Sequence, residues 1–359
     1  MAYTTIDDPS AHFQIALYTG NQTGRSITYD GNSDMQPDWL WGKSRSNSDA
    51  PTAIDSSRGV GNVLTPSANE AEGTGQSQYV TSFNSDGFGL GTNGGMNRND
   101  YTYVSWGWKA NGGTTASNTS GTNITSTVQA NTTAGFSIVT WTGTGTISDT
   151  VGHGLGVKPD VVLAKERGGA DWWHMRHESL GSTENLFLND TLASRNATGG
   201  DYGGNIDGLT SSVFGFSTNS GGNAVSVNDN TVTNVAYCFT PIQGYSKFGS
   251  YTGNGSEEGP FVYTGFKPQW IMFKNTGAAE EWVLQDTTRN PNNPVTKNIR
   301  VDSNIAEADA SNIDFDFLSN GFKNRSNQAQ VNSNGVNYIY MAFAEHPFVS
   351  SKGIPTTAR

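Results

Sequence analysis

The stretch KPDVVLAK at residues 158–165 decides the fold, and it returns as QPDWLWGK at 36–43 and as KPQWIMFK at 267–274. Proline cannot donate a hydrogen bond to a sheet, so it belongs at the first position of the strand that it introduces. The residues after it are apolar at both alternating positions, which indicates a strand covered on both faces. We therefore predict a central strand in each copy, with the final lysine marking its exit to solvent.

Two further markers accompany this strand in the same order in every copy. An aromatic residue followed by Thr-Gly precedes it, at 18–20, 141–143 and 251–253. A Gly-Phe pair follows it, before a closing strand rich in aromatic residues, at 87–88, 215–216 and 321–322. Such ordered recurrence predicts three copies of one unit, each about 100 residues long.

The repeat divides the chain into segments, which are an N-terminal arm at 1–12, unit 1 at 13–110, a linker at 111–134, unit 2 at 135–243, unit 3 at 244–349 and a C-terminal tail at 350–359. The linker is almost wholly Gly, Ser, Thr, Asn and Ala, and we expect it not to pack. Because units 2 and 3 adjoin directly, we expect them to form a tight pair, with unit 1 loosely attached. The two ends are expected to be free arms available for docking.

The composition favours an all-β fold. Of the 359 residues, 44 are glycine, 34% are hydrophobic and 11% are aromatic. Many short strands joined by Gly-rich turns, with enough aromatic residues for a core, are typical of sandwiches and barrels rather than of disorder. We predict three tandem antiparallel β-sandwich units of jelly-roll type.

The charge argues against nucleic acid and membranes as partners. The formal net charge is −11, and lysine and arginine form no large cluster, whereas a phosphate backbone demands concentrated positive charge. No apolar run has the length of a membrane span, and the start of the chain lacks a signal peptide. We therefore expect cytoplasmic synthesis without membrane insertion. The single cysteine, Cys238, aligns with Ser105 and Ala342 and is expected to fill space in a core.

The residues that could carry chemistry form no recognised catalytic motif. His174, His177 and Glu178 resemble a fragment of a metal site, but a zincin places its histidines four residues apart on a helix, and this segment alternates like a strand. Carboxylate pairs, which a glycosidase would place across a cleft, occur at 257–258, at 280–281 and at Asp314 and Asp316. We expect no catalytic residue, no metal site and no cofactor, although bound calcium stays open.

Two tryptophans remain as candidate ligand contacts. Trp172 and Trp108 have no counterpart in every unit, whereas Trp173 aligns with Trp282 and is expected to belong to the core. An exposed tryptophan beside Asp and Asn can stack on a sugar ring while its neighbours hydrogen-bond the hydroxyls. The sequence therefore predicts Trp172 and Trp108 as glycan-stacking residues.

The repeat markers, the opening YTTIDDPS at 3–10 and the closing segment at 347–359 resemble a family of tailed-bacteriophage virion proteins common among marine phages and cyanophages. The likeness extends over essentially the whole chain. Its most specific motifs are the KPD strand of unit 2 and AGFSIVTWTG at 134–143. It implies a concanavalin-like, lectin-type jelly roll and carries over no catalytic residue. Unit 1 departs most, with Gln36 in place of lysine and Pro51 in place of tryptophan, so a ligand site of the other units need not extend to it.

From the repeat and this resemblance we expect a structural protein of the phage virion surface, acting as a tail fibre, head fibre, knob or capsid decoration. It would display lectin-like modules and attach to glycans on the host surface. Expected partners are other capsid or tail proteins, further copies of the chain in a homo-oligomer, and host polysaccharide. The alternative is a polysaccharide-degrading, tail-associated enzyme, which would need a cleft lined by two carboxylates.

Overall fold

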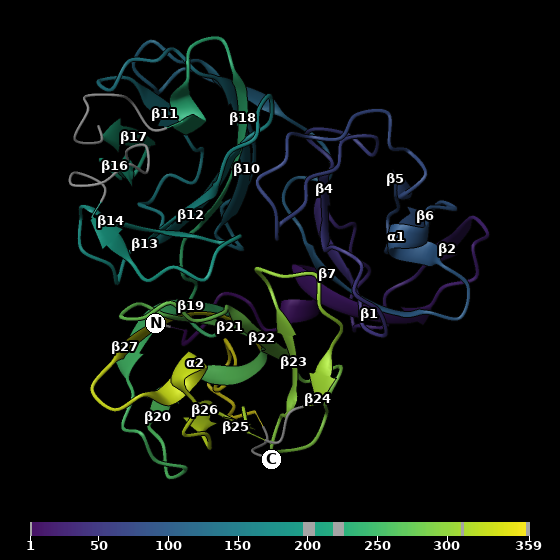
Figure 1. The fold of residues 1–359 in the computed structure, drawn as a ribbon, viewed down its shortest axis with the longest axis vertical. Coiled ribbons are helices and arrows are strands. Elements are labelled where there is room, and N and C mark those ends of the chain that lie inside the picture. Colours follow the sequence, from purple (N-terminus) through teal and green to yellow (C-terminus); the bar gives the residue numbers. More distant parts are fainter. Residues whose placement is uncertain (1, 197–204, 218–225, 310–311, 357–359) are drawn as a thin grey trace.

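The three repeats form three lobes around a common centre in the computed structural model (Figure 1). The structure describes residues 2–196, 205–217, 226–309 and 312–356. Each lobe contains a larger and a smaller antiparallel sheet, which confirms the prediction of an all-β fold with sandwich-like units. Within the described ranges, no helix is long and apolar enough to cross a membrane.

The larger sheet keeps one strand order in every unit. In unit 1 it is β1 (Phe13–Thr19), β7 (Thr102–Trp108), β3 (Trp39–Ser44) and β4 (Thr52–Asp55). In unit 2 the equivalent strands are β10 (Phe136–Thr142), β18 (Thr233–Phe239), β12 (Val161–Glu166) and β13 (Trp173–His177), followed by β14 (Glu184–Phe187) and β15 (Arg195–Asn196). In unit 3 they are β19 (Ser246–Thr252), β27 (Asn337–Pro347), β21 (Phe266–Asn275) and β22 (Val283–Asp286), followed by β23 (Lys297–Arg300) and β24 (Ala308–Asp309). The Pro-led strand thus lies inside each sheet, as predicted.

The smaller sheet also repeats. Its strands are β2 (Arg25–Ile27), β6 (Phe88–Leu90) and β5 (Val80–Phe83) in unit 1, β11 (Thr150–Gly152), β17 (Val213–Ser217) and β16 (Asn205–Asp207) in unit 2, and β20 (Phe261–Tyr263), β26 (Gly321–Asn324) and β25 (Phe315–Leu318) in unit 3. The short helices are η1 (Pro9–Ala11), α1 (Gly94–Asn97), η3 (Ser226–Asn228) and α2 (Ala329–Asn332). The Gly-Phe marker supplies the middle strand of this sheet. A Cβ on Gly87, whose φ is +89°, would lie 1.9 Å from the Ile27 carbonyl oxygen, so only glycine fits there.

Each Pro-led strand is apolar on both faces because two different cores cover it. Leu40, Val162 and Ile271 point into the sandwich core of their own unit. Their neighbours in sequence point the other way, into one central core that all three larger sheets share; they are Trp39 and Trp41, Val161 and Leu163, and Trp270 and Met272. Within this central core the Trp39 ring stacks on that of Tyr237 from unit 2, with ring centroids 4.2 Å apart. Each large apolar side chain buried there contributes about 1.5–3 kcal/mol to stability.

The shared core overturns the expectation that unit 1 is loosely attached. Trp108, in the last strand of unit 1, contacts the ring of Trp270 in unit 3 at 5.7 Å. Trp39 of the same unit contacts unit 2. The length of chain between units 1 and 2 carried no information about packing, because the contacts that hold the units together lie far apart in sequence.

The prediction that residues 111–134 form an unpacked linker is also wrong. The segment forms β8 (Ala116–Asn118) and β9 (Ser126–Asn131), which extend the larger sheet of unit 2 beside β10. Its two isolated apolar residues, Ile124 and Val128, are buried in the core of unit 2. Ser126 is fully buried and donates from Oγ to the Gly152 carbonyl at 2.7 Å. Short polar side chains that find backbone partners can therefore build packed strands without a strong apolar signal.

The chain ends are packed within the described residues, contrary to the expectation of free arms. Ile6 joins the central core, and the Thr4 hydroxyl donates to the Gln243 carbonyl at 2.7 Å. The Asp7 carboxylate accepts a hydrogen bond from the Ser351 amide at 2.6 Å, so the two ends meet. Residues 1 and 357–359 of the predicted arms lie outside the described residues.

The three repeated lysines were predicted to reach solvent, but all three are buried. Lys43, Lys165 and Lys274 are at most 1% exposed. Each ammonium donates to a backbone carbonyl of the turn that follows its own strand, which is that of Asn47 for Lys43, of Gly169 for Lys165 and of Glu280 for Lys274. Burial lowers the pKa of all three to about 8. The repeated lysine is therefore a structural cross-link of the turn that follows the strand.

Cys238 is buried in the core of unit 2, as predicted for a space-filling residue. Burial raises the pKa of its thiol to about 12. The cysteine is therefore protonated near neutral pH, which is the unreactive form.

The contact between units 1 and 2 is built on a buried ionic cluster. Arg58 Nε donates to the Asp55 carboxylate at 2.5 Å, and both side chains are fully buried. The Tyr237 hydroxyl of unit 2 donates to the same carboxylate at 2.7 Å. Glu72 joins Arg58 at 2.6 Å to Arg167 of unit 2 at 2.7 Å. The charges are thus paired on both sides of the interface.

The contact between units 3 and 1 repeats this cluster with other residues. Asp286 and Arg289 pair at 2.6 Å, and the Trp106 indole of unit 1 donates to Asp286 at 3.1 Å. Glu307 then joins Arg289 to Arg45 of unit 1, at 3.0 and 2.9 Å. Equivalent surfaces meet in the same head-to-tail sense, which is how a threefold ring closes.

The contact between units 2 and 3 has uncharged side chains at the same positions. His177 takes the place of the aspartate and Leu180 that of the arginine, while Met341 stands where Tyr237 and Trp106 stand in the other units. His177 Nδ1 accepts from the Ser179 amide at 3.1 Å, so Nε2 carries the proton and donates to the Tyr340 carbonyl at 3.2 Å. Without a donor at 341, a neutral imidazole replaces the carboxylate.

This interface predicts an acid-sensitive step in stability. Burial lowers the pKa of His177 to about 4 from its ordinary value of 6.5. Between pH 4 and pH 6.5, His177 is therefore protonated in the unfolded chain and neutral in the folded protein. The contribution to stability is complete above pH 6.5 and is lost as pH falls toward 4. From pH 7 to pH 5 we expect this group to lower the free energy of unfolding by about 2 kcal/mol.

Urea unfolding of the protein and of a His177→Gln variant at pH 7 and pH 5 measures this contribution. The variant is expected to lose that part of the pH dependence. His346→Gln is the control, because it also removes one histidine and the His346 side chain is 52% exposed rather than buried between two units. Equal pH dependence in the protein and in His177→Gln would contradict the assignment.

Candidate functional site

Trp108 cannot be the glycan-stacking residue that the sequence predicted. Its side chain is 1% exposed and lies in the central core. Its ring stacks on Trp39, with centroids 4.6 Å apart, and contacts Phe13 at 4.9 Å. The lack of a counterpart in every unit, which suggested exposure, instead reflects different aromatic residues filling one shared core.

Trp172 is half-buried in the turn between β12 and β13. Its ring packs on Phe187 of β14, with centroids 4.9 Å apart. Only part of the ring can meet a ligand, and its role in stacking stays a prediction.

The histidine next to Trp172 lies in a small polar cluster. His174 Nε2 lies 3.1 Å from the Ser226 hydroxyl and 3.4 Å from the Asp171 carboxylate, while Ser226 also donates to Asp171. A catalytic triad has the acid on Nδ1 and the serine on Nε2. Here both approach the same nitrogen, and Nδ1 has no hydrogen-bond partner among the described residues. The cluster therefore does not activate the serine.

One member of each carboxylate pair is engaged in a surface ion pair. Glu258 contacts Lys323 at 2.6 Å and Arg325 at 3.0 Å, and Asp316 also pairs with Arg325. Glu281 lies 3.6 Å from Arg300. Across the part of the chain that the structure describes, no three His, Cys, Asp or Glu side chains are grouped to hold a metal ion.

A groove near both chain ends is a further candidate site. It consists of two cavities of about 470 and 610 Å³ that share Tyr3 and Gln243. We call it the Tyr263 groove, since Tyr263 at the end of β20 lines the first cavity. It lies where the N-terminal arm packs on unit 3.

The strand β20 beside this groove carries two exposed aromatic side chains, of which Tyr263 lines the groove and Phe261 does not. Phe261 and Tyr263 are 48% and 47% exposed, although they alternate along β20 with Val262, which packs against the core of unit 3. Phe261 and Tyr263 therefore lie on the opposite face of β20, which is exposed. Large aromatic residues held outward on such a strand are an available stacking surface.

Hydrogen-bonding groups surround the Tyr263 ring. Tyr3 donates from its hydroxyl to the Gly265 carbonyl at 2.8 Å, and the Tyr3 and Tyr263 hydroxyls lie 3.0 Å apart. The Lys247 ammonium lies 5.5 Å from the Tyr263 ring centroid and donates to its carbonyl at 2.6 Å. Asp160 lines the same cavity, and burial, assisted by the nearby Glu178 charge, raises its pKa to about 6. An aromatic face with several donors and acceptors suits a sugar ring.

The sequence contained one signal for this groove. The segment FVY at 261–263 places aromatic residues at both outward positions of a short strand, whereas the equivalent strands RSI at 25–27 and TVG at 150–152 have none. Aromatic residues are so common in this chain that the direction in which these two point could not be inferred.

With this geometry established, comparison with known proteins gives one match. A family model described as a domain of unknown function, DUF7483, matches residues 8–347. The chain belongs to this family. The match runs through all three units, so a single DUF7483 domain comprises the whole ring rather than one repeat. No curated protein and no solved structure gives a match.

Proposed function

We propose that this protein is a structural component of a tailed-phage virion surface that attaches to host glycans through its jelly-roll-like modules. The observation that carries the proposal is the Tyr263 groove, in which an exposed aromatic ring is surrounded by hydroxyl, ammonium and carbonyl groups. This combination is the one that binds sugars through stacking and hydrogen bonds.

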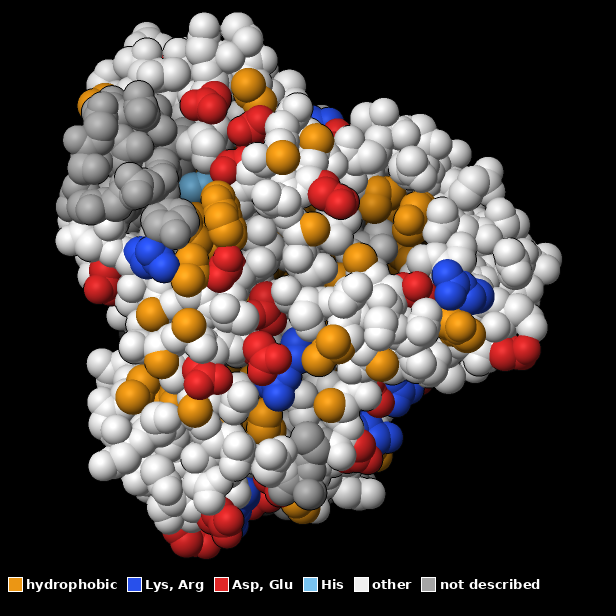
Figure 2. Space-filling view, viewed as in Figure 1, with side chains coloured by type: hydrophobic (Ala, Val, Ile, Leu, Met, Phe, Trp, Pro, Cys, Tyr) orange, Lys and Arg blue, Asp and Glu red, His pale blue; other side chains and the backbone are white. Residues whose placement is uncertain are grey.

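The architecture supports a role in display. One chain builds a closed ring of three modules around a single core, an arrangement that virion appendages commonly obtain from three chains. Over the face shown in Figure 2 the surface is mostly uncharged, with acidic and basic side chains scattered across it. The similarity of the sequence to phage virion proteins supplies the biological setting. Other virion proteins and further copies of the chain are its proposed partners.

Replacement of Tyr263 with alanine should weaken glycan binding about tenfold, because it removes the exposed stacking surface. Binding is measured on a host-surface glycan array and then by titration with the strongest glycan. Stability should change little, since the side chain is half exposed. Phe261→Ala, at the other exposed aromatic position of β20, is the matched control and should bind as the unmodified protein does, because Phe261 does not line the groove. Trp172→Ala tests the other predicted stacking residue.

Three results would contradict the proposal. Loss of binding in Trp172→Ala but not in Tyr263→Ala would place the site at the turn before β13. Absence of the chain from purified particles would remove it from the virion. Release of oligosaccharides from host polysaccharide would make the protein an enzyme.

A further inference from the structure

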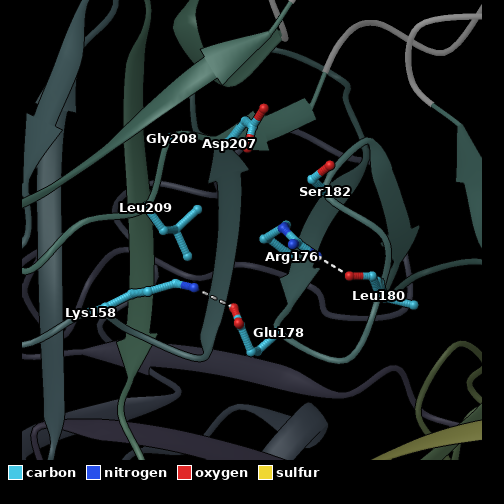
Figure 3. A pocket seen from close by; sticks show the side chains of 8 residues that line it. All are labelled: Lys158, Arg176, Glu178, Leu180, Ser182, Asp207, Gly208 and Leu209. Atoms are coloured by element: carbon cyan, nitrogen blue, oxygen red, sulfur yellow. Dashed lines mark hydrogen bonds and ion pairs between the residues drawn. The ribbon is translucent and has the colours of Figure 1, made fainter.

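A separate cavity, of about 380 Å³, opens in unit 2 around Arg176 of β13 (Figure 3). We call it the Arg176 pocket; Lys158, Glu178, Ser182, Asp207 and Leu209 also line it. Figure 3 shows Arg176 in the middle of these side chains. The pocket is distinct from the Tyr263 groove, with which it shares no lining residue.

Arg176 is a buried arginine without a carboxylate partner. It is 7% exposed, and its Nη1 donates to the backbone carbonyls of His177 and Leu180. Among the described residues, Nε has no hydrogen-bond partner and no carboxylate lies within ion-pair distance of the guanidinium. The buried Arg58 and Arg289, by contrast, each pair with two carboxylates. A buried charge left unpaired is costly, which points to an anion from outside the chain.

The corresponding position in unit 3 shows what a closed version looks like. Gln285 occupies it, and its amide nitrogen donates to the carbonyls of Val295 at 3.0 Å and Ile313 at 2.7 Å. The nearby cavity, lined by Lys267 and Phe317, measures only about 180 Å³. Unit 1 has Ile54 there, buried in its sandwich core. Only unit 2 combines an arginine with an enlarged opening.

The other charges in the pocket select among anions. Lys158 and Glu178 pair at 2.8 Å, and both side chains are nearly half exposed. Asp207, at the end of β16, adds a second negative charge. Phosphate, which carries about two negative charges, would be repelled by Asp207 more than a single carboxylate would be, whereas sugar hydroxyls can donate hydrogen bonds to Asp207. A ligand with one carboxylate and several hydroxyls therefore fits best.

We propose that the Arg176 pocket binds a uronic acid residue, whose carboxylate pairs with the Arg176 guanidinium while its hydroxyls contact Asp207 and Ser182. Arginine and a carboxylate form a planar, charge-assisted contact. The proposal rests on the proposed function in one respect, which is that the uronic acid would belong to a host glycan. Binding of the sugar itself needs no such setting.

Titration of the full-length protein with glucuronate, followed by calorimetry or NMR, tests the site. Glucuronate should bind, glucose and acetate should bind at least about tenfold more weakly, and Arg176→Gln should weaken glucuronate binding about tenfold. Asp207→Asn should weaken it as well, with the fold intact by circular dichroism. Lys267→Gln, at the corresponding rim in unit 3, is the matched control and should not change binding.

The outcomes separate this inference from the proposed function. No glucuronate binding, equal binding in Arg176→Gln, or equally tight binding of inorganic phosphate would overturn the inference. Tyr263→Ala should leave glucuronate binding intact. If glucuronate binds at Arg176 while no host glycan binds the protein, the inference stands and the proposed function falls.

Discussion

Replacement of Arg58 with leucine is expected to lower the free energy of unfolding by about 3–5 kcal/mol. The substitution leaves the Asp55 carboxylate fully buried, with the Tyr237 hydroxyl and the amide of residue 58 as its remaining donors among the described residues. It also removes one of the two cations that contact Glu72. Equilibrium unfolding in urea, monitored by tryptophan fluorescence, measures the loss.

Two comparisons make this prediction specific. Arg167→Leu removes the other partner of Glu72. Because the Arg167 side chain is 21% exposed, this substitution should lower the free energy of unfolding clearly less. The triple replacement Asp55→His, Arg58→Leu and Tyr237→Met copies the residues found between units 2 and 3. It should recover part of the stability lost by Arg58→Leu alone, because no unpaired buried charge remains. A triple variant less stable than the single one would contradict this account.

Replacement of Trp108 with alanine should cost about 3–5 kcal/mol, since it leaves a large cavity in a well-packed core. The ring contacts residues from two units, including Phe13, Trp39 and Trp270. Because one core joins all three units, the variant should still unfold in a single transition, at a lower urea concentration. Urea unfolding followed by fluorescence and by circular dichroism should give the same midpoint.

Trp172→Ala is the control for this substitution. Its ring is half-buried against Phe187, so a much smaller loss of stability is expected. If Trp108→Ala instead produced two separate transitions, units 2 and 3 would be folding independently of unit 1. That result would contradict a common central core.

The candidate sites were harder to predict than the fold. Tyr263 and Arg176 lie in strands of the repeated unit. Their candidate roles depend on the absence of other side chains over them, which is a property of the tertiary structure. Tyr263 is exposed because it points away from the core that Val262 packs against. Arg176 opens on a cavity because unit 2 lacks the closure that Gln285 makes in unit 3 with distant carbonyls. Neither condition is written in the residues next to them.

The sequence by itself determined the three repeats, the all-β class and the central place of the Pro-led strands, because alternation and proline act locally on the strand that contains them. Tertiary structure alone decided which surface covers each face. Trp39 and Leu40 are equally apolar, but one meets the core of all three units and the other meets its own sandwich. Burial depends on apolar area and not on its source, so local pattern cannot distinguish a partner unit from a partner sheet. For the same reason the sequence predicted a separate unit 1, an exposed Trp108 and a solvated Lys165. In the folded ring, unit 1 packs on the other two units, and both side chains are buried.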